Sequence, residues 1–432
     1  MDVNIRSVLF NNIIREMKAI YENDEFNAQK FIQENEQLYP QEKEQLIIIN
    51  DDYKLNVLCI HCQSELFAKY SCANCIQQHI IDNFDNWNSG DKIIDTMIKY
   101  FQILYSSDPT KIIEWFPYEN FKYVVKKAEG GVGSIFIASL SNTIFSWDYY
   151  NKKFMRDSQP KKVVLKSLLA SNDDEQENFF KEALIHITLA IEVENLISCY
   201  GITKDPESGK FMMVLERQDD GDLRSFINNT DIAHTWREIF TLLNDISLGL
   251  YEIHKRDMIH KDLHPGNILF SNGIWKICDF GFSEPANKSS EIVGVLPYIA
   301  PEVLLERNYT SAADIYSIGI IMWQLITKCN PYGDLKCDNE IQVALEICKG
   351  RRPTNDFKLY PDYEKMMKRC WDVNISNRPS ASELYNFSKE NLQKIFKKEF
   401  FIPELGNNFD FLKSTHISDI FQEPKTFSTG IR

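Results

Sequence analysis

The chain of 432 residues has no run of about 18 consecutive apolar residues, so a membrane-spanning helix is not expected. Its first residues, Met1-Asp2-Val3-Asn4, lack a basic stretch followed by an apolar one, so no secretory signal is expected. Positive charge is also scarce, because 48 Lys and Arg stand against 62 Asp and Glu, for a net charge of -14. Nucleic acid and anionic membranes attract clustered positive charge, so neither is an expected partner.

The composition is that of a folded protein. Hydrophobic residues make up 44% and charged residues 25%, and the length allows a two-lobed core with appendages. Ten cysteines without a secretory signal indicate a reducing compartment, where metal ligands or plain thiols are expected rather than disulfides. We therefore expect a cytoplasmic location, with the nucleus as the alternative.

Three segments carry structural signals without a clear chemistry. Residues 1–55 are acidic and helical in pattern, which suits either a packed cap or a partner-binding helix. Residues 81–117 are predicted to be a helical linker, in which Asp91 caps a helix with an apolar stripe. Residues 399–432 show no period, so an irregular tail is expected.

Four cysteines form two pairs of equal spacing. They are Cys59, Cys62, Cys72 and Cys75, with two residues inside each pair and nine between the pairs. Each Cys-x-x-Cys places two thiolates on one tight turn, and four thiolates suit tetrahedral Zn²⁺ and leave no open position. We therefore expect a structural zinc in a zinc-ribbon-like segment over residues 56–80. His61 is an alternative ligand that we interpret as a bystander, and buried thiols without metal are the other interpretation.

A glycine-rich stretch, Ala128-Glu129-Gly130-Gly131-Val132-Gly133, lies between two β-type runs. Such a turn lets backbone N–H groups approach phosphate oxygens, although turns between strands are often glycine-rich. The next β-type run ends at Lys166, and a lysine on a buried strand needs an anion. Glu182, in the following helical run, is the expected partner. The alternative is an edge-strand lysine that reaches water.

The most informative stretch is His260-Lys261-Asp262-Leu263-His264-Pro265-Gly266-Asn267. Asp279, in Asp279-Phe280-Gly281, follows Asp262 by seventeen positions. Farther on come Ala300-Pro301-Glu302, then Asp314 with Gly319, and then Cys370-Trp371 with Arg378-Pro379. With these motifs in this order, residues 118–398 resemble the eukaryotic protein kinase domain.

The resemblance implies a bilobal α+β fold, with a small β-rich lobe and a large helical lobe. The stretch from Leu296 to Glu302, with Cys370-Trp371, is similar to the tyrosine-kinase-like group. The cysteine segment ahead of the kinase part, with Trp115-Phe116-Pro117-Tyr118, resembles fungal kinases of the arbuscular-mycorrhizal type. Residues 141–161 make a longer connection than the usual turn, so a surface insertion is expected there.

The resemblance also implies a role for each matching residue in phosphoryl transfer from ATP with Mg²⁺. Asp262 would accept the proton of the substrate hydroxyl, and Asp279 and Asn267 would bind Mg²⁺. Lys166 would hold the α- and β-phosphates and Glu182 would hold Lys166. The other implied nucleotide contacts are Gly130, Gly131 and Gly133 over the phosphates, Ile135, Val164 and Leu269 around the adenine, Leu215 as gatekeeper, and the backbone of Glu216 and Gln218. The implied structural contacts are Glu302 with Arg378, and Asp314.

Several positions depart from the family pattern. Lys261 replaces an Arg and loses its two-pronged geometry, and His264 stands where Ser/Thr kinases usually carry Lys. The other departures are Ala128 for the first loop glycine, Gly266 where tyrosine kinases usually have Arg, Val295 for a Thr, and His186 at a usually apolar position. None removes a metal ligand or the base.

Three functions are compatible with these motifs and this composition. The first is a protein kinase in signalling, acting on protein Ser/Thr rather than Tyr, with a regulatory protein partner at the N-terminal segment. The second is a pseudokinase scaffold that binds ATP weakly, and the third is a nucleic-acid module, which the acidic balance disfavours. Phosphate on Ser289 or Ser290 is expected to raise activity only modestly, because Lys261 would meet it as a point charge.

Overall fold

The computed structural model describes residues 59–64, 72–86, 88–130, 133–168, 175–228, 235–285, 292–335, 340–354 and 359–397. The predictions for residues 1–55 and 399–432, and those for Gly131, Ser289 and Ser290, lie outside these residues. The chain divides into two compact units. The smaller unit comprises the described residues of 1–88, 99–112 and 143–157, and the larger unit those of 89–98, 113–142 and 158–432.

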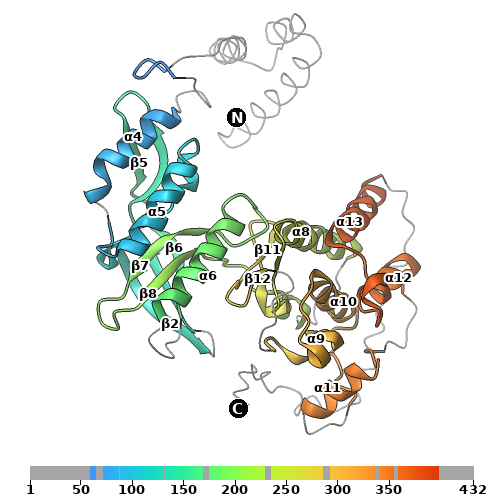
Figure 1. Cartoon of the computed structure of the whole chain (residues 1–432). Helices are drawn as coiled ribbons and strands as arrows, with labels where there is room; N and C mark the ends of the chain where they lie inside the picture. Colours follow the sequence, from blue (N-terminus) through green and yellow to red (C-terminus); the bar gives the residue numbers. More distant parts are fainter. Residues whose placement is uncertain are drawn as a thin grey trace, which may run out of the picture. The chain divides into compact units, whose positions relative to one another are not determined.

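The larger unit begins with a β-rich lobe (Figure 1). Its six-stranded sheet has the order β1-β7-β8-β6-β3-β2. The strands are β1 (Glu114–Trp115), β2 (Phe121–Gly130), β3 (Gly133–Leu140), β6 (Lys161–Leu168), β7 (Cys199–Lys204) and β8 (Phe211–Glu216). One helix, α6 (Glu175–Ala190), lies in this lobe and contacts β6, β7 and β8. A buried apolar cluster that includes Phe116, Leu140 and Leu165 forms the core beneath the sheet.

The second lobe of the larger unit is mostly helical. Its helices are α7 (Leu223–Asn228), α8 (Trp236–His254), α9 (Pro301–Glu306), α10 (Ser311–Thr327), α11 (Glu340–Cys348), α12 (Pro361–Cys370) and α13 (Ala381–Phe396). Capping boxes at Thr235 and Ser380 fix the starts of α8 and α13, which pack against each other. Helix α10 is buried along nearly its whole length, so it forms the centre of this core. The predicted bilobal α+β fold is confirmed.

Two short β-ladders and several single turns of 3₁₀ helix complete the helical lobe. The ladders are β9 (Met258–Ile259) with β12 (Glu284–Pro285), and β10 (Ile268–Ser271) with β11 (Ile274–Ile277). The 3₁₀ turns are η3 (Tyr118–Asn120) in the first lobe and η4 (Pro265–Asn267), η5 (Leu296–Tyr298) and η6 (Ile375–Asn377) in the second.

The smaller unit gathers segments that are distant in the sequence. It contains the described cysteine turns, helix α4 (Ala73–Asn83), the 3₁₀ turns η1 (Phe84–Asn86) and η2 (Pro109–Lys111), and a hairpin of β4 (Thr143–Asp148) and β5 (Lys153–Asp157). Helix α5 (Lys92–Leu104) runs from one unit into the other. As predicted, Asp91 caps α5, because its carboxylate accepts hydrogen bonds from the N–H groups of Ile93 and Ile94.

The insertion between β3 and β6 is more than a surface loop. Its two strands pair in an antiparallel hairpin, and Trp147 and Tyr149 are buried in the cluster that contains Cys59, Cys72 and Cys75. The expectation of a surface insertion was therefore incomplete, because length alone says nothing about which side chains become buried. No helix in the described part of the chain is both long and apolar enough to span a bilayer.

Candidate active site and cysteine cluster

Lys166 lies at the centre of the site in the larger unit. Strand β6 pairs Lys166 with Ile135 of β3, and the lysine Nζ lies 2.7 Å from Glu182 Oε1 on α6 and 2.7 Å from Asp279 Oδ1. All three side chains are largely buried, so the cation compensates two carboxylates in a place of low water content. Burial alone would raise the pKa of Asp279, but the Lys166 ammonium outweighs it and holds the pKa near 2. Asp279 is thus ionised at neutral pH.

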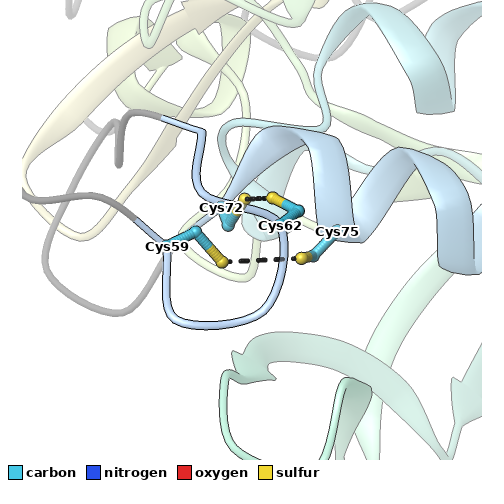
Figure 2. Close-up of side chains that lie close together, drawn as sticks. All are labelled: Cys59, Cys62, Cys72 and Cys75. Carbon is cyan, nitrogen blue, oxygen red and sulfur yellow. Dashed lines mark hydrogen bonds between the residues drawn. The ribbon is translucent and has the colours of Figure 1, made fainter.

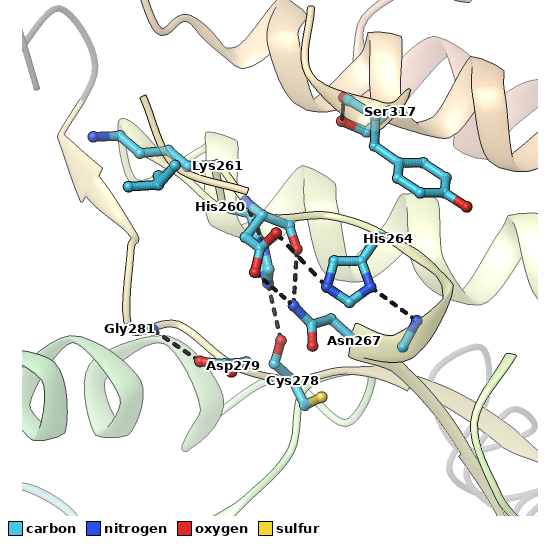
Figure 3. A network of polar contacts seen from close by, with 12 residues as sticks. His260, Lys261, His264, Asn267, Cys278, Asp279, Gly281 and Ser317 are labelled. Atoms are coloured by element: carbon cyan, nitrogen blue, oxygen red, sulfur yellow. Dashed lines mark hydrogen bonds and ion pairs between the residues drawn. The ribbon is translucent and has the colours of Figure 1, made fainter. Parts of the chain in front are cut away.

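Asp262 and Asn267 form the second part of the site, and Figure 3 labels Asn267 among its neighbours. The side-chain amide of Asn267 donates to the Asp262 backbone carbonyl at 2.9 Å and to Asp262 Oδ2 at 3.2 Å. The other carboxylate oxygen of Asp262 is buried and has no hydrogen-bond partner among the described residues. A buried acceptor without a donor lowers the free energy of unfolding. Such an atom is typical of a group that accepts a hydrogen bond from a substrate hydroxyl.

His264 faces the same carboxylate. Its Nδ1 accepts a hydrogen bond of 3.0 Å from the Gly266 N–H, so in the neutral ring the proton resides on Nε2. That Nε2 lies 3.7 Å from Asp262 Oδ1. A Cβ on Gly266 would come within 2.8 Å of His264 Cε1 and 2.9 Å of an Arg224 nitrogen, so a side chain there would displace the imidazole.

Asp314 holds the loop that carries Asp262. Its buried carboxylate accepts the backbone N–H groups of His260 and Lys261 at 2.9 and 3.0 Å, and lies 2.8 Å from His254 Nε2. Burial would raise the pKa of Asp314, but the His254 contact and these donors lower it. The ionised Asp314 side chain therefore holds the backbone of the loop at His260 and Lys261 in place.

Phe280 connects the two lobes through two imidazole rings. Its ring meets His186 of α6 at 4.9 Å and His260 at 5.5 Å, both edge-on. His186 is buried, and its Nε2 lies 2.7 Å from the Ile197 carbonyl oxygen. Burial lowers the pKa of His186 to about 4, so the ring is neutral and its Nε2–H can donate to the Ile197 carbonyl at this otherwise apolar position.

The remaining implied nucleotide contacts lie on the sheet and the segment that follows it. Val164 of β6 pairs with Ile137 of β3 and Leu215 of β8. The Glu216 N–H donates to the Ser198 carbonyl, and both polar side-chain atoms of Gln218 are buried without a partner among the described residues. Gly130 pairs with Gly133 across the predicted turn, and Leu269 lies in β10.

Three contacts close to the site were not predicted from the sequence. Gly294 adopts φ +112°, and a Cβ there would lie 3.3 Å from Asp262 Oδ1, so the chain passes close to the carboxylate. The Tyr309 hydroxyl accepts the Val293 N–H at 2.9 Å and donates to the Val293 carbonyl at 3.2 Å. Lys261 Nζ lies 4.7 Å from the centre of the Tyr309 ring. Because only spatial proximity connects these residues, no spacing in the sequence indicated them.

The four predicted zinc ligands converge in the smaller unit (Figure 2). The Sγ atoms of Cys59 and Cys75 are 3.6 Å apart, those of Cys62 and Cys72 are 3.4 Å apart, and all four lie within 4.8 Å of one another. Tetrahedral zinc with Zn–S bonds of about 2.3 Å separates its sulfurs by about 3.8 Å. Cys72 is the N-cap residue of helix α4 and Cys75 lies in its first turn. Burial raises the pKa of both thiols, so a bound cation would be what holds them as thiolates. Zinc therefore fits the donor set.

The ionisation of Cys59 also favours a metal. Burial raises the pKa of its thiol, but backbone N–H groups of His61 and Cys62, with the Tyr149 hydroxyl, lower it to about 6. One of these bonds is the His61 N–H to Cys59 Sγ at 3.4 Å. His61 Nε2 itself lies 3.0 Å from the Tyr149 carbonyl oxygen rather than among the sulfurs.

Residues 151–388 match the family model described as the protein kinase domain. The match covers more than half of the chain and includes Lys166, Glu182, Asp262, Asn267 and Asp279. The glycine-rich turn at residues 130–133 and the four cysteines lie ahead of it. The chain belongs to the protein kinase family.

Proteins similar to this chain include kinases from an amoeba and from a virus. The stress-activated protein kinase alpha of Dictyostelium discoideum is 30% identical over 238 residues, which is 51% of this chain and 36% of that protein. The probable serine/threonine-protein kinase roco7 of the same organism is 28% identical over 305 residues, covering 67% of this chain and 11% of that protein. A putative serine/threonine-protein kinase/receptor, R818, of Acanthamoeba polyphaga mimivirus is 32% identical over 177 residues, or 40% of this chain and 10% of that protein. The chain thus spans about a third or less of these relatives' lengths.

Proposed function

We propose that the protein is an active protein kinase that transfers the γ-phosphate of ATP to serine or threonine hydroxyls of proteins in a signalling process. The observation that carries the proposal is Lys166, whose Nζ meets both Glu182 and Asp279 at 2.7 Å. Phosphoryl transfer requires positioned cations and carboxylates more than covalent chemistry, and this contact brings them together from both lobes.

Each group in the site has a defined task in this reaction. Lys166 binds the α- and β-phosphates and Glu182 orients Lys166. Asp279 and the Asn267 carbonyl are hard oxygen ligands suited to Mg²⁺, which neutralises phosphate charge when bound. Asp262, with one carboxylate oxygen free of described partners, orients the substrate hydroxyl and accepts its proton. The His264 Nε2–H points a donor toward the same region at 3.7 Å.

The surroundings of Gly266 support serine and threonine over tyrosine as the acceptor. A side chain at this position would meet the ends of the His264 and Arg224 side chains, so an Arg like that of tyrosine kinases would require both to move. Serine/threonine kinases among the similar proteins agree with this preference. We further assign the chain to the tyrosine-kinase-like group, with a kinase domain over 118–398, fungal relatives of the cysteine-segment type, and a cytoplasmic or nuclear location.

The cysteine cluster is proposed to bind one structural Zn²⁺. Four sulfurs at near-tetrahedral separations leave no open coordination position, so the ion would stabilise the fold rather than take part in the reaction. Metal analysis of the freshly purified, reduced chain should give one zinc per chain. A metal-free preparation that stays fully folded would contradict the assignment.

A radiolabelled phosphate-transfer assay tests the kinase proposal. Asp262→Asn should keep nucleotide binding and lose at least 100-fold in turnover, because the ATP contacts remain while the base is lost. Asp257→Asn is the matched control, because Asp257 is an exposed aspartate five residues upstream, and it should behave as wild type.

The scaffold alternative gives the opposite result. Wild type that binds ATP but labels neither itself nor generic protein substrates would be a pseudokinase, and the departures at Ala128, His264 and Val295 would then explain the loss.

A further inference from the structure

The hairpin inserted into the kinase sheet belongs to the same compact unit as the cysteine turns. Strands β3 and β6 stay paired up to Leu140 and Lys161, and the hairpin begins at Thr143 and ends at Asp157. Its apolar side chains share one buried cluster with Cys59, Cys72, Cys75, Ile76 and Ile80. The hairpin between β3 and β6 therefore supplies part of the apolar surroundings of the cysteines.

Tyr149 makes polar contacts between the hairpin and the first cysteine turn. Its hydroxyl accepts the Ile60 N–H at 2.8 Å, and it lowers the pKa of the Cys59 thiol, as a donor to the sulfur does. A thiolate sulfur that binds a metal carries no hydrogen, so toward a ligating Cys59 the phenolic O–H is the donor and the sulfur is the acceptor. The Tyr149 backbone carbonyl lies 3.0 Å from His61 Nε2, and the two rings are 5.3 Å apart. Tyr149 thus contacts three consecutive residues of the turn.

Donors to sulfur matter in a site of this composition. Four thiolates around one Zn²⁺ carry a net charge of about -2, so each hydrogen bond to sulfur spreads charge that the metal leaves uncompensated. Outer groups of this kind also fix the orientation of the ligands, and their removal costs roughly 10- to 100-fold in metal affinity. Tyr149 is 5% exposed, so water does not easily replace its hydroxyl.

We propose that Tyr149 is a positioning residue of the Cys59–Cys62–Cys72–Cys75 metal site, and that the 143–157 hairpin folds together with this site. The proposal rests on the proposed zinc. Metal binding fixes the turn at residues 59–62, and the contacts of Tyr149 extend that order to the hairpin. Loss of the metal therefore loosens a segment joined directly to β3 and to β6, the strand that carries Lys166.

Zinc release to a chromophoric chelator, measured on the full chain, tests the role of the hydroxyl. Tyr149→Phe keeps the ring and removes only the hydroxyl, and it should lower zinc affinity by roughly 10- to 100-fold. Tyr150→Phe is the matched control, because Tyr150 is adjacent and 65% exposed, and it should stay within about twofold of wild type. Equal affinity of the two variants would overturn the positioning role.

A Co²⁺-loaded preparation separates this failure from failure of the zinc assignment. Wild type should show sulfur-to-cobalt charge-transfer bands, and Tyr149→Phe should shift them, because a hydrogen bond to a ligating sulfur is lost. Absence of the bands in wild type would refute the metal site itself. Bands identical in wild type and Tyr149→Phe would refute the hydrogen bond alone.

Hydrogen exchange of the full chain tests the coupling of the hairpin to the metal. After chelation, peptides from 143–157 should lose protection, whereas peptides from α8 and α10 should keep theirs, because those helices have their own core. Hairpin peptides that stay protected after complete removal of the metal would overturn the coupling.

Discussion

The buried pair of Glu302 and Arg378 gives the sharpest stability prediction. The Arg378 side chain is fully buried, and its guanidinium meets Glu302 with two parallel contacts of 2.7 and 2.8 Å. It also donates to the backbone carbonyls of Ala312 and Asp372, both at 2.9 Å. Arg378→Met removes the charge at similar length and leaves the buried Glu302 carboxylate without its two guanidinium donors. Breaking such a pair costs about 3–5 kcal/mol of unfolding free energy.

The double variant Arg378→Met/Glu302→Leu separates the effect of an unpaired buried charge from the effect of lost side-chain packing. It leaves no uncompensated charge, so it should be about 1–3 kcal/mol more stable than Arg378→Met alone. Equilibrium denaturation at pH 7 measures both, and the single variant should melt roughly 6 to 20 °C below wild type. If the two variants were equally unstable, or if Arg378→Met cost less than about 1 kcal/mol, the carboxylate would not depend on this partner and the reasoning would fail.

Two further predictions concern stability at low pH and the segment beside Asp262. Burial, only partly opposed by the hydrogen bond to Ile197, lowers the pKa of His186 from 6.5 to about 4. Between pH 6.5 and pH 4 the imidazole is therefore protonated in the unfolded chain and neutral in the folded chain. The group should therefore cost roughly 3 kcal/mol of stability as pH falls from 6.5 to 4, and His186→Leu should flatten that part of the stability–pH curve; an unchanged slope would count against a neutral buried ring. Tyr309→Phe removes the hydroxyl that bonds both backbone groups of Val293, so hydrogen exchange at residues 292–295 should rise about 5- to 150-fold, as expected for 1–3 kcal/mol. Unchanged exchange there would show that the hydroxyl does not anchor the segment.

The hypothesis of a modest phosphate effect on Lys261 also has a structural context. The ammonium lies over the Tyr309 ring, and that same residue binds Val293 through its hydroxyl. Because a cation that already contacts an aromatic face gains less from a second partner, this contact is consistent with a small response to phosphorylation at Ser289 or Ser290. Those serines lie outside the described residues, so the hypothesis depends on turnover measurements.

The sequence by itself determined the family and the fold class, and it indicated the residue types of both sites. The reason is that the chemistry restricts short segments: the base Asp262 and the amide ligand Asn267 stand five positions apart, and two thiolates need a Cys-x-x-Cys turn. The helix capped by Asp91 was predictable for the same reason, because caps and apolar stripes are local.

Only the tertiary structure decided which atoms meet across long separations. Lys166 and Asp279 are 113 positions apart, and Ile60 and Tyr149 are 89 apart, so no local pattern connects them. The sequence suggested a surface insertion at 141–161, whereas packing buried Trp147 and Tyr149 beside the cysteines. Burial depends on what the rest of the chain brings to a side chain, and the folded chain alone supplies those neighbours.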